Sequence, residues 1–269
     1  MIRGISQSLL DFLRDSRKTK VIEDQASRVD TDLAIATEKP EFLQVVWDLQ
    51  QIMLDQMKSN DHNHPIYIEL GAGVLPMSVR SSHIKSTDIV ESSHLDGVLD
   101  ATNLDLPNES VDGLFLQNTF HHIPDPDAFF RECFRVLKPG GRVVILDPYF
   151  NLLSSRLYQI LFRSESFDKS GSWNDASEHA MIGANQALSY IVFKRDRKRY
   201  ESLNSHLKIV NDFPVSSGLR YLLTGGLNFR RIAPRWIFPL IRKCEGNRFL
   251  ATPFAIHWIV VLEKVPSNL

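Results

Sequence analysis

The chain has 269 residues, 43% of them hydrophobic and 23% charged, with a formal net charge of −1. This composition is ordinary for a globular protein with a substantial core, and its charge gives no overall attraction to nucleic acid or to an anionic membrane. The longest apolar runs are shorter than the roughly 18 residues of a membrane span, and two cysteines, Cys133 and Cys244, make no disulfide framework, so we expect two buried thiols.

Residues 1–60 are predicted to form a helical cap. Within residues 41–57, apolar side chains recur at helical spacing, which favours a packing helix over a partner site: Phe42, Val45, Val46, Leu49, Ile52 and Met53. Residues 2–13 are also amphipathic, which leaves binding to a membrane surface open as an alternative. They lack the hydrophobic core and cleavage site of a secretion signal, so we expect a cytoplasmic protein.

Residues 61–64 have the sequence Asp-His-Asn-His, which has the residue types of a metal site. Neighbouring cysteines that often complete a zinc site are missing, and Pro65 opens a strand directly behind the segment. We therefore predict an exposed loop and no metal.

The most informative segment is residues 66–73, Ile-Tyr-Ile-Glu-Leu-Gly-Ala-Gly. Its apolar, partly β-branched beginning predicts a strand buried on both faces. Gly71 and Gly73 permit a tight turn and a close approach of the backbone to a ligand, and Pro76 suits the first turn of a helix. A strand followed by two such glycines predicts a nucleotide-type cofactor loop, although a plain turn has the same pattern.

Asp88 ends a second predicted strand, residues 84–88, and lies 17 residues after Gly71. Nucleotide-binding βαβ units place an acid about 20 residues after the glycine turn, where its carboxylate accepts both ribose hydroxyls. A solvated aspartate at a strand end is the alternative interpretation.

Residues 97–149 predict three further strands, at 98–100, 111–117 and 143–146. Between the last two, Asp125-Pro126 caps a helix, and residues 138–141 (Lys-Pro-Gly-Gly) stop it and turn the chain. The apolar face of this helix consists of Phe129, Phe130, Cys133, Phe134 and Leu137. Strands that alternate with helices predict a parallel, doubly wound sheet with its ligands at the carboxyl ends of the strands.

Beyond residue 150 the alternation stops, and we predict helices at 152–162 and 183–199. An insertion after the fifth strand lies over the carboxyl ends of the sheet, so residues 151–205 are predicted to form a lid with substrate contacts. Tyr149, Arg163, Trp173 and Asn185 are its weak candidates. Residues 206–269 complete the sheet, with strands at 206–213 and 254–263. Residues 235–243 are apolar enough to touch a lipid-linked substrate, but core packing is the expected use.

In order, residues 69–73, Asp88, Asp100-Ala101, residues 118–122 and residues 137–141 resemble the motifs of class I S-adenosylmethionine-dependent methyltransferases, especially a bacterial subset similar to the type 11 methyltransferases. The resemblance is strong over residues 66–149. It implies an α/β fold: a Rossmann-like, doubly wound seven-stranded sheet with a helical amino-terminal segment and a substrate-cap insertion. Residues 61–150 would be the cofactor-binding core.

The resemblance also implies the cofactor, S-adenosyl-L-methionine, and its site. The methionine end falls to Glu69, Gly71 and Gly73, the ribose to Asp88, and the adenine to Asp100 and Ala101. We expect Ala72, Ile89 and Asn118 to line the same site. Two features depart from the family pattern: Leu75 stands where a third glycine is usual, and the link from Asp88 to Asp100 leaves little room for a helix.

A general base is expected in the loop after the fourth strand, which contains His121 and His122. An imidazole titrates near neutral pH and can take a proton from a hydroxyl group. His122 matches the family's frequent histidine and is the first candidate for base or structural residue, with His121 as the alternative facing the substrate. The competing interpretation is that either ring only caps or packs the loop.

The sequence thus predicts methyl transfer to a small molecule or saccharide, most simply onto oxygen, without metal and without nucleic acid. Substrate identity and oligomeric state cannot be inferred. A non-catalytic cofactor-binding protein with a degenerate glycine loop at Leu75 remains the alternative. A nicotinamide dehydrogenase fits less well, because position 76 is proline where its cofactor loop would need a glycine.

Overall fold

The computed structural model describes the chain over residues 11–18, 25–57, 65–151, 154–155, 166–174, 184–246 and 252–265. The chain divides into two compact units, one formed by residues 1–50 with 215–255 and the other by residues 51–214 with 256–269. The helices predicted at residues 2–13 and 152–162 fall largely outside the described residues, as do the Asp-His-Asn-His segment and Arg163.

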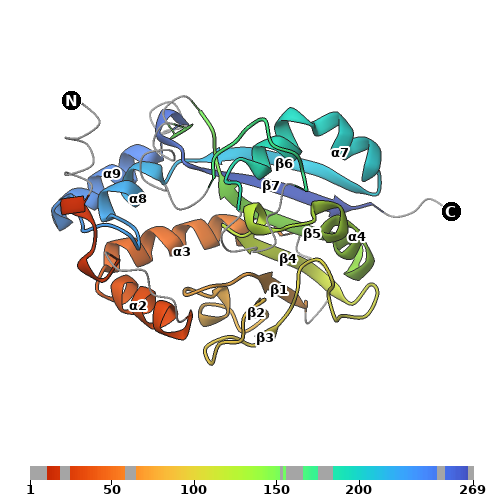
Figure 1. The fold of residues 1–269 in the computed structure, drawn as a ribbon, viewed down its shortest axis with the longest axis horizontal. Helices are drawn as coiled ribbons and strands as arrows, with labels where there is room; N and C mark the ends of the chain where they lie inside the picture. Colours follow the sequence, from red (N-terminus) through yellow and green to blue (C-terminus); the bar gives the residue numbers. More distant parts are fainter. Residues whose placement is uncertain are drawn as a thin grey trace. The chain divides into compact units, whose positions relative to one another are not determined.

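A seven-stranded sheet in the order β3-β2-β1-β4-β5-β7-β6 forms the centre of the second unit (Figure 1). β1 to β5 run parallel, and β7 pairs antiparallel with β5. The strands are β1 (Tyr67–Leu70), β2 (Ile84–Asp88), β3 (Gly97–Val98), β4 (Val111–Gln117), β5 (Leu137–Pro148), β6 (Leu207–Val215) and β7 (His257–Lys264). The predicted seven-stranded α/β fold is confirmed.

The inner strands are apolar because both of their faces are covered. β4 is buried from Val111 to Leu116, and β5 from Val143 to Pro148. β7 lies between β5 and β6 and is buried from His257 to Leu262, as predicted for an inner strand.

One predicted turn lies inside a strand. Lys138, Pro139, Gly140 and Gly141 fall within β5, although Gly140 has a φ of +79°. The β4–β5 register passes from Val111↔Leu137 to Gly113↔Arg142. The four residues bulge out while pairing continues on both sides, so the turn survives as an irregularity within the longer strand.

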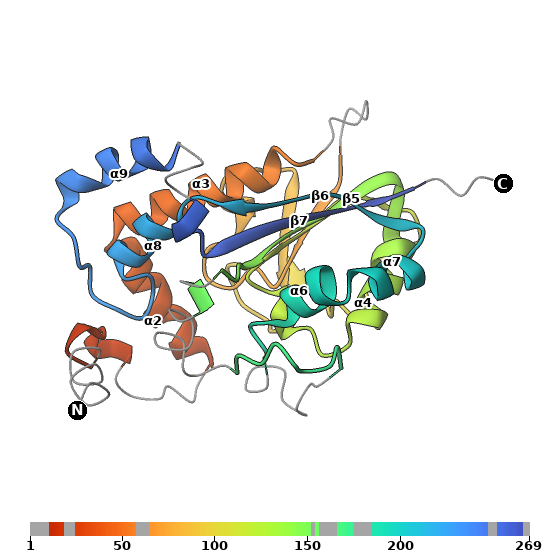
Figure 2. The same ribbon diagram turned by 90° about the horizontal axis from the view of Figure 1, so that it is seen from above.

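Helix α4 (Pro126–Val136) forms as predicted. The carboxylate of Asp125 caps it by accepting a hydrogen bond from the Ala128 N–H at 2.9 Å. Its buried side chains include Phe129, Phe130 and Cys133. Figure 2 shows α4 on the same face of the sheet as α6 (Leu188–Tyr190) and α7 (Arg197–Leu203).

The single helix predicted at residues 183–199 is wrong. Between α6 and α7 the backbone forms a π-helix, η4 (Ile191–Arg195), and α7 starts after Asp196. The buried, bulky residues Ile191, Val192 and Phe193 occupy this wider turn. Such π-turns are uncommon and occur often at functional sites.

The helix predicted to start at Pro76 is also wrong. Pro76 is extended, with φ −67° and ψ 145°, and precedes a 3₁₀ turn, η2 (Met77–Val79). β2 begins only five residues later, which leaves no room for an α-helix. The described chain between β2 and β3 contains no helix either, in agreement with the predicted short link.

The first unit contains α2 (Gln25–Thr37), α3 (Pro40–Leu54), α8 (Gly218–Thr224), α9 (Phe238–Glu245) and the short turns η1 (Ser16–Lys18), η5 (Arg235–Ile237) and η6 (Thr252–Phe254). α3 starts here and continues into the second unit. Its predicted apolar stripe is buried at Phe42, Val45, Val46, Leu49 and Met53.

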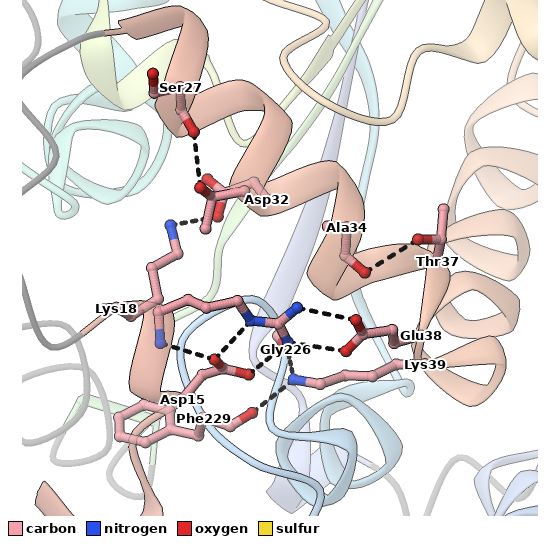
Figure 3. A network of polar contacts seen from close by, with 12 residues as sticks. Asp15, Lys18, Ser27, Asp32, Ala34, Thr37, Glu38, Lys39, Gly226 and Phe229 are labelled. Atoms are coloured by element: carbon pink, nitrogen blue, oxygen red, sulfur yellow. Dashed lines mark hydrogen bonds and ion pairs between the residues drawn. The ribbon is translucent and has the colours of Figure 1, made fainter.

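A buried lysine joins distant segments of this first unit. The Lys39 ammonium donates to the carbonyl oxygens of Gly226 and Phe229 at 2.7 and 2.6 Å (Figure 3). Arg17 bonds Asp15 and Glu38 in the same network. Burial lowers the pKa of Lys39, and the two carbonyls compensate for the water that its ammonium has lost.

Two surface features differ from expectation. Cys133 is buried as predicted, but Cys244 on α9 is exposed. In residues 235–243, Phe238 and Ile241 are buried, whereas Trp236 and Leu240 are 70% and 57% exposed. Core packing therefore accounts for only one side of this segment. No helix among the described residues is long and apolar enough to cross a membrane.

Candidate functional site

The strand order reverses at β1, which has β2 on one side and β4 on the other. In doubly wound sheets, the carboxyl ends of the strands at such a switch point are the usual ligand position. The predicted glycine loop follows β1, Asp88 ends β2, and the two histidines follow β4. These sequence-predicted residues therefore lie at one edge of the sheet.

Gly71 packs against the end of β4. It has a φ of +68°, and a Cβ atom at this position would lie 2.2 Å from Cγ2 of Thr119. The Thr119 hydroxyl in turn donates to the Gly71 carbonyl at 3.0 Å. Only glycine fits this contact.

Gly73 also has a positive φ, +56°, but beyond its chain neighbours no atom of the described residues lies within 4 Å of the position of its missing Cβ. The loop is therefore open on that side, where a ligand can approach its backbone. Ala72, between the two glycines, donates its N–H to the Thr87 carbonyl at 2.9 Å, which fixes the loop to the end of β2.

Leu75 does not distort this loop. Among the described non-glycine residues, only Glu109 and Asn118 have a positive φ, so Leu75 has an ordinary backbone conformation. The conformational freedom of a third glycine is not required at this position.

Asp88 lies beside the glycine loop. One carboxylate oxygen accepts from the Gly73 N–H at 3.1 Å and the other from the Val90 N–H at 3.2 Å. A carboxylate has about four acceptor positions, so these bonds leave capacity for ribose hydroxyls. The neighbouring Ile89 is 55% exposed and presents an apolar side chain at the same strand end.

His94, which the sequence did not single out, holds the loop from the other side. Its Nε2 lies 2.8 Å from the Gly73 carbonyl oxygen and its Nδ1 lies 2.8 Å from the Ser92 hydroxyl. Because a carbonyl only accepts, Nε2 must carry the proton. The short β2–β3 link thus takes part in shaping the glycine loop.

Glu69 is buried beneath the loop, with 1% of its surface exposed. One oxygen accepts from the Met77 N–H at 2.7 Å and from the Ser86 hydroxyl at 2.5 Å. The other, Oε1, has no hydrogen-bond partner among the described residues. An unpartnered buried carboxylate oxygen fits a cofactor that brings a hydrogen-bond donor, such as the amino group of its methionine part.

Burial raises the pKa of Glu69 to about 7, although the bonds from Ser86 and Met77 oppose the shift. In the unfolded chain this carboxyl would titrate near 4.5. The folded state therefore holds its proton more tightly, so the contribution to stability is complete below pH 4.5 and disappears as the pH rises through 7.

We expect the free energy of unfolding of the ligand-free protein to include a Glu69 contribution that falls by up to about 3 kcal/mol over this range, since one pKa unit is about 1.4 kcal/mol. Urea unfolding at several pH values, compared between wild type and Glu69→Gln, isolates it. The free energy of unfolding should fall less between pH 5 and 8 in the variant than in wild type. An equal fall in both proteins would contradict the raised pKa.

Asp100 and Ala101 follow β3 at the next strand end. Val98 pairs with Asp88, so Asp100 lies two residues beyond the partner of the proposed ribose acid. Asp100 is exposed, and its Oδ1 accepts from the N–H and hydroxyl of Thr102 at 2.8 and 2.7 Å. Both bonds are accepted by Oδ1, and they fix the turn.

Asn118 has a φ of +54°, which is rare for a residue with a side chain. Its N–H donates to the Leu146 carbonyl at 2.7 Å and continues the β4–β5 ladder as the chain turns away. Backbone strain of this kind often marks a functional loop. It directs the following residues, including both histidines, over the end of β5.

His121 is buried and forms a pair with Asp147 at the end of β5. Its Nδ1 lies 2.9 Å from Asp147 Oδ1, and both side chains are at most 5% exposed. The Ser189 hydroxyl donates to the second oxygen, Oδ2. Since an ionised carboxylate only accepts, His121 carries its proton on Nδ1, and Nε2 is the basic nitrogen.

His122 occupies a different environment. Its ring lies against that of His121, with a centroid distance of 4.2 Å and an angle of 39° between the ring planes, and it is half-buried. The sequence placed His122 first, but the carboxylate partner belongs to His121. The geometry therefore favours His121 as the ring that a carboxylate orients.

Three residues of this cluster were missed. Asp147, Ser189 and His257 gave no local signal, because β5, α6 and β7 bring them together from distant parts of the sequence. Burial lowers the pKa of His257 to about 4, against the opposing charge of Asp147, so its ring is neutral at pH 7.

A metal centre finds no support in the described part of the chain, where no three histidine, cysteine or acidic side chains gather.

Comparisons with known proteins indicate the family of this chain. Residues 45–145 and residues 97–202 match two families, each described as a methyltransferase domain. A phosphoethanolamine N-methyltransferase of Arabidopsis thaliana is 44% identical over 50 residues, which are 19% of this chain and 10% of that protein. Methyltransferase GfsG of Streptomyces halstedii is 32% identical over 71 residues, 26% of this chain and 25% of that protein.

The geranyl diphosphate C-methyltransferase of Streptomyces coelicolor A3(2), solved with Mg²⁺, geranyl diphosphate and S-adenosyl-L-homocysteine, is 12% identical with a TM-score of 0.50. The match covers 83% of each chain and shows a shared fold alone. The chain matches only a tenth and a quarter of the two curated relatives. With the sheet order and the ordered motifs, the two domain matches place this chain in the family of class I S-adenosylmethionine-dependent methyltransferases.

Proposed function

We propose that the protein transfers the methyl group of S-adenosylmethionine to a small-molecule acceptor at the carboxyl ends of β1, β4 and β5. The observation that carries this proposal is the position of the His121–Asp147 pair. The pair lies at the carboxyl ends of β4 and β5, the strands beside the switch point at β1, and next to the open glycine loop.

In this proposal the residues of the loop hold the cofactor. Glu69 Oε1 and the open side of Gly73 receive its methionine end, Asp88 its ribose, and Asp100 with Ala101 its adenine. Ala72, Ile89 and Asn118 complete the walls. The bound cofactor supplies an electrophilic methyl group on a sulfonium sulfur, so the protein has to align the acceptor and remove one proton.

His121 Nε2 would remove that proton. Its Nδ1–H donates to Asp147, which fixes the ring and stabilises the imidazolium that forms when Nε2 takes the proton. Ser189 holds the second oxygen of Asp147 and thereby the orientation of the carboxylate. His122 supports the ring of His121 through the contact between the two rings.

The acceptor atom that we propose is an oxygen, as in a hydroxylated small molecule or saccharide. A hydroxyl group loses its proton as it is methylated and is a weak nucleophile, which explains the need for a base. The relatives include enzymes that are named for N- and C-methylation, so the test has to be open to all three atoms.

The test incubates the protein and deuteromethyl-labelled cofactor with a small-molecule extract and searches for a mass increase by untargeted mass spectrometry. We expect one or a few extract components to gain a deuteromethyl group with wild type and none with Asp88→Ala. If the cofactor binds but no component is labelled in extracts of any source tried, non-catalytic cofactor binding replaces the proposal.

We also propose that residues 151–205 act as a lid with substrate contacts. Two of the predicted residues are already tied within the segment: Trp173 Nε1 donates to Asp196 at 3.0 Å, and Asn185 Nδ2 to the Asp168 carbonyl at 2.7 Å. Amide hydrogen exchange is expected to slow across residues 166–200 when cofactor and acceptor are added. Unchanged protection there, with protection gained at the glycine loop, would contradict a lid.

A further inference from the structure

Three aromatic rings surround the ammonium group of Lys169. Its Nζ lies 4.8 Å from the ring centre of Tyr190, 5.5 Å from that of Phe150 and 5.7 Å from that of Phe167. The rings also contact each other edge to face, with centroid distances of 4.8 Å between Phe150 and Phe167 and 6.1 Å between Phe150 and Tyr190. We call Phe150, Phe167 and Tyr190 the aromatic cage.

The backbone around the cage is firmly held. Asp168 N–H donates to the Asn185 side chain at 3.0 Å, and Arg195 donates to the carbonyls of Lys169 and Gly171 at 2.6 and 2.9 Å. The cage walls therefore stand on fixed segments, while the Lys169 side chain reaches them through a flexible four-carbon chain. The side chain can leave without unfolding the loop.

The electrostatics leave Lys169 poorly satisfied. Its one described hydrogen bond is to the Ser155 hydroxyl at 3.2 Å, and no carboxylate pairs with it within the described residues. Burial lowers the pKa of Lys169, and the positive charge of Lys194 adds to this effect. The attraction comes from the faces of the rings, which is how proteins bind ammonium and quaternary ammonium ligands.

The cage adjoins the proposed site of methyl transfer through the chain itself. Phe150 lies three residues after Asp147, and Tyr190 directly follows Ser189, whose hydroxyl donates to Asp147. A ligand with its cation in the cage would therefore extend along the carboxyl end of β5, where His121 lies.

We propose that the aromatic cage is a binding site for an ammonium group of the acceptor molecule, and that Lys169 occupies this site as a placeholder when the acceptor is absent. The assignment of the ligand as an acceptor rests on the proposed function; the binding of an ammonium group does not. The substrate would then be a small molecule that carries an amine or quaternary ammonium in addition to its methyl-accepting atom.

The experiment measures binding of choline and of its uncharged carbon analogue, 3,3-dimethylbutan-1-ol, to the full chain by calorimetry without cofactor. Lys169→Ala vacates the cage, whereas Lys169→Met keeps it filled by a side chain of similar length. We expect Lys169→Ala to bind choline about tenfold more tightly than wild type and to prefer it over the carbon analogue by a similar factor. Lys169→Met should bind neither better than wild type.

In the Lys169→Ala background, Tyr190→Leu should abolish the preference for choline and Tyr190→Phe should retain it, with thermal unfolding as the check that each variant is folded. Equal binding of choline and its carbon analogue to Lys169→Ala would overturn the proposal. If choline binds but no acceptor is methylated, the cage proposal stands and the proposed function is contradicted. If acceptors are methylated but choline does not bind, the proposed function stands and the cage proposal is contradicted.

Discussion

Asp88→Ala is expected to weaken the binding of S-adenosylmethionine and of S-adenosylhomocysteine by at least about 10²-fold. A hydrogen bond to a charged group contributes about 1.5–3 kcal/mol, and the ribose would make two of them. The variant also loses the bond that Asp88 accepts from Gly73, so the glycine loop loses one of its supports. Calorimetric titration of both cofactor forms measures the change.

Two further variants separate these contributions. Asp88→Asn keeps an acceptor for the Gly73 N–H but removes the charge, and we expect it to bind with intermediate affinity. Asp105→Ala removes an exposed carboxylate of the β3–β4 link and should bind as wild type does. Equal cofactor binding by Asp88→Ala and wild type would show that the acid at the end of β2 does not hold the ribose.

His121→Gln is expected to lower turnover by about 10²- to 10⁴-fold, the usual contribution of a general base, once an acceptor is identified. His122→Gln removes a ring that does not pair with Asp147, so we expect it to lower turnover only a few-fold. Both variants should bind the cofactor as wild type does, because neither residue belongs to the glycine loop. Single-turnover rates with saturating cofactor measure the chemical step.

Asp147→Asn tests the positioning of the ring. The amide can hold His121 Nδ1 but no longer stabilises the imidazolium, so we expect turnover to fall and its rise with pH to shift, while Ser189→Ala has a smaller effect of the same sign. A loss in His122→Gln that exceeds the loss in His121→Gln would favour the ranking that the sequence suggested. Near wild-type turnover in both single variants and in the double variant would leave alignment alone as the source of catalysis.

The sequence by itself determined the features that depend on neighbours along the chain. The apolar runs predicted the inner strands β4, β5 and β7, because a strand buried on both faces must be continuously apolar. Gly71, Gly73 and Asp88 could be assigned to one site because consecutive parallel strands end at the same edge of a sheet. The Asp125 cap and the face of α4 followed from local hydrogen bonding and helical spacing.

The tertiary structure decided what depends on segments distant in the sequence. Pro76 precedes a 3₁₀ turn rather than a helix because β2 pairs with β1 five residues after η2. The choice of His121 over His122 depends on which ring meets Asp147, a residue 26 positions away, and on Ser189 and His257 arriving from other elements. Likewise, Phe150, Phe167 and Tyr190 have no common period, and only the fold brings their rings around one ammonium group. Periodicity and motif order predict strands and their ends, whereas the pairing of side chains is fixed by packing between elements, which no local pattern encodes.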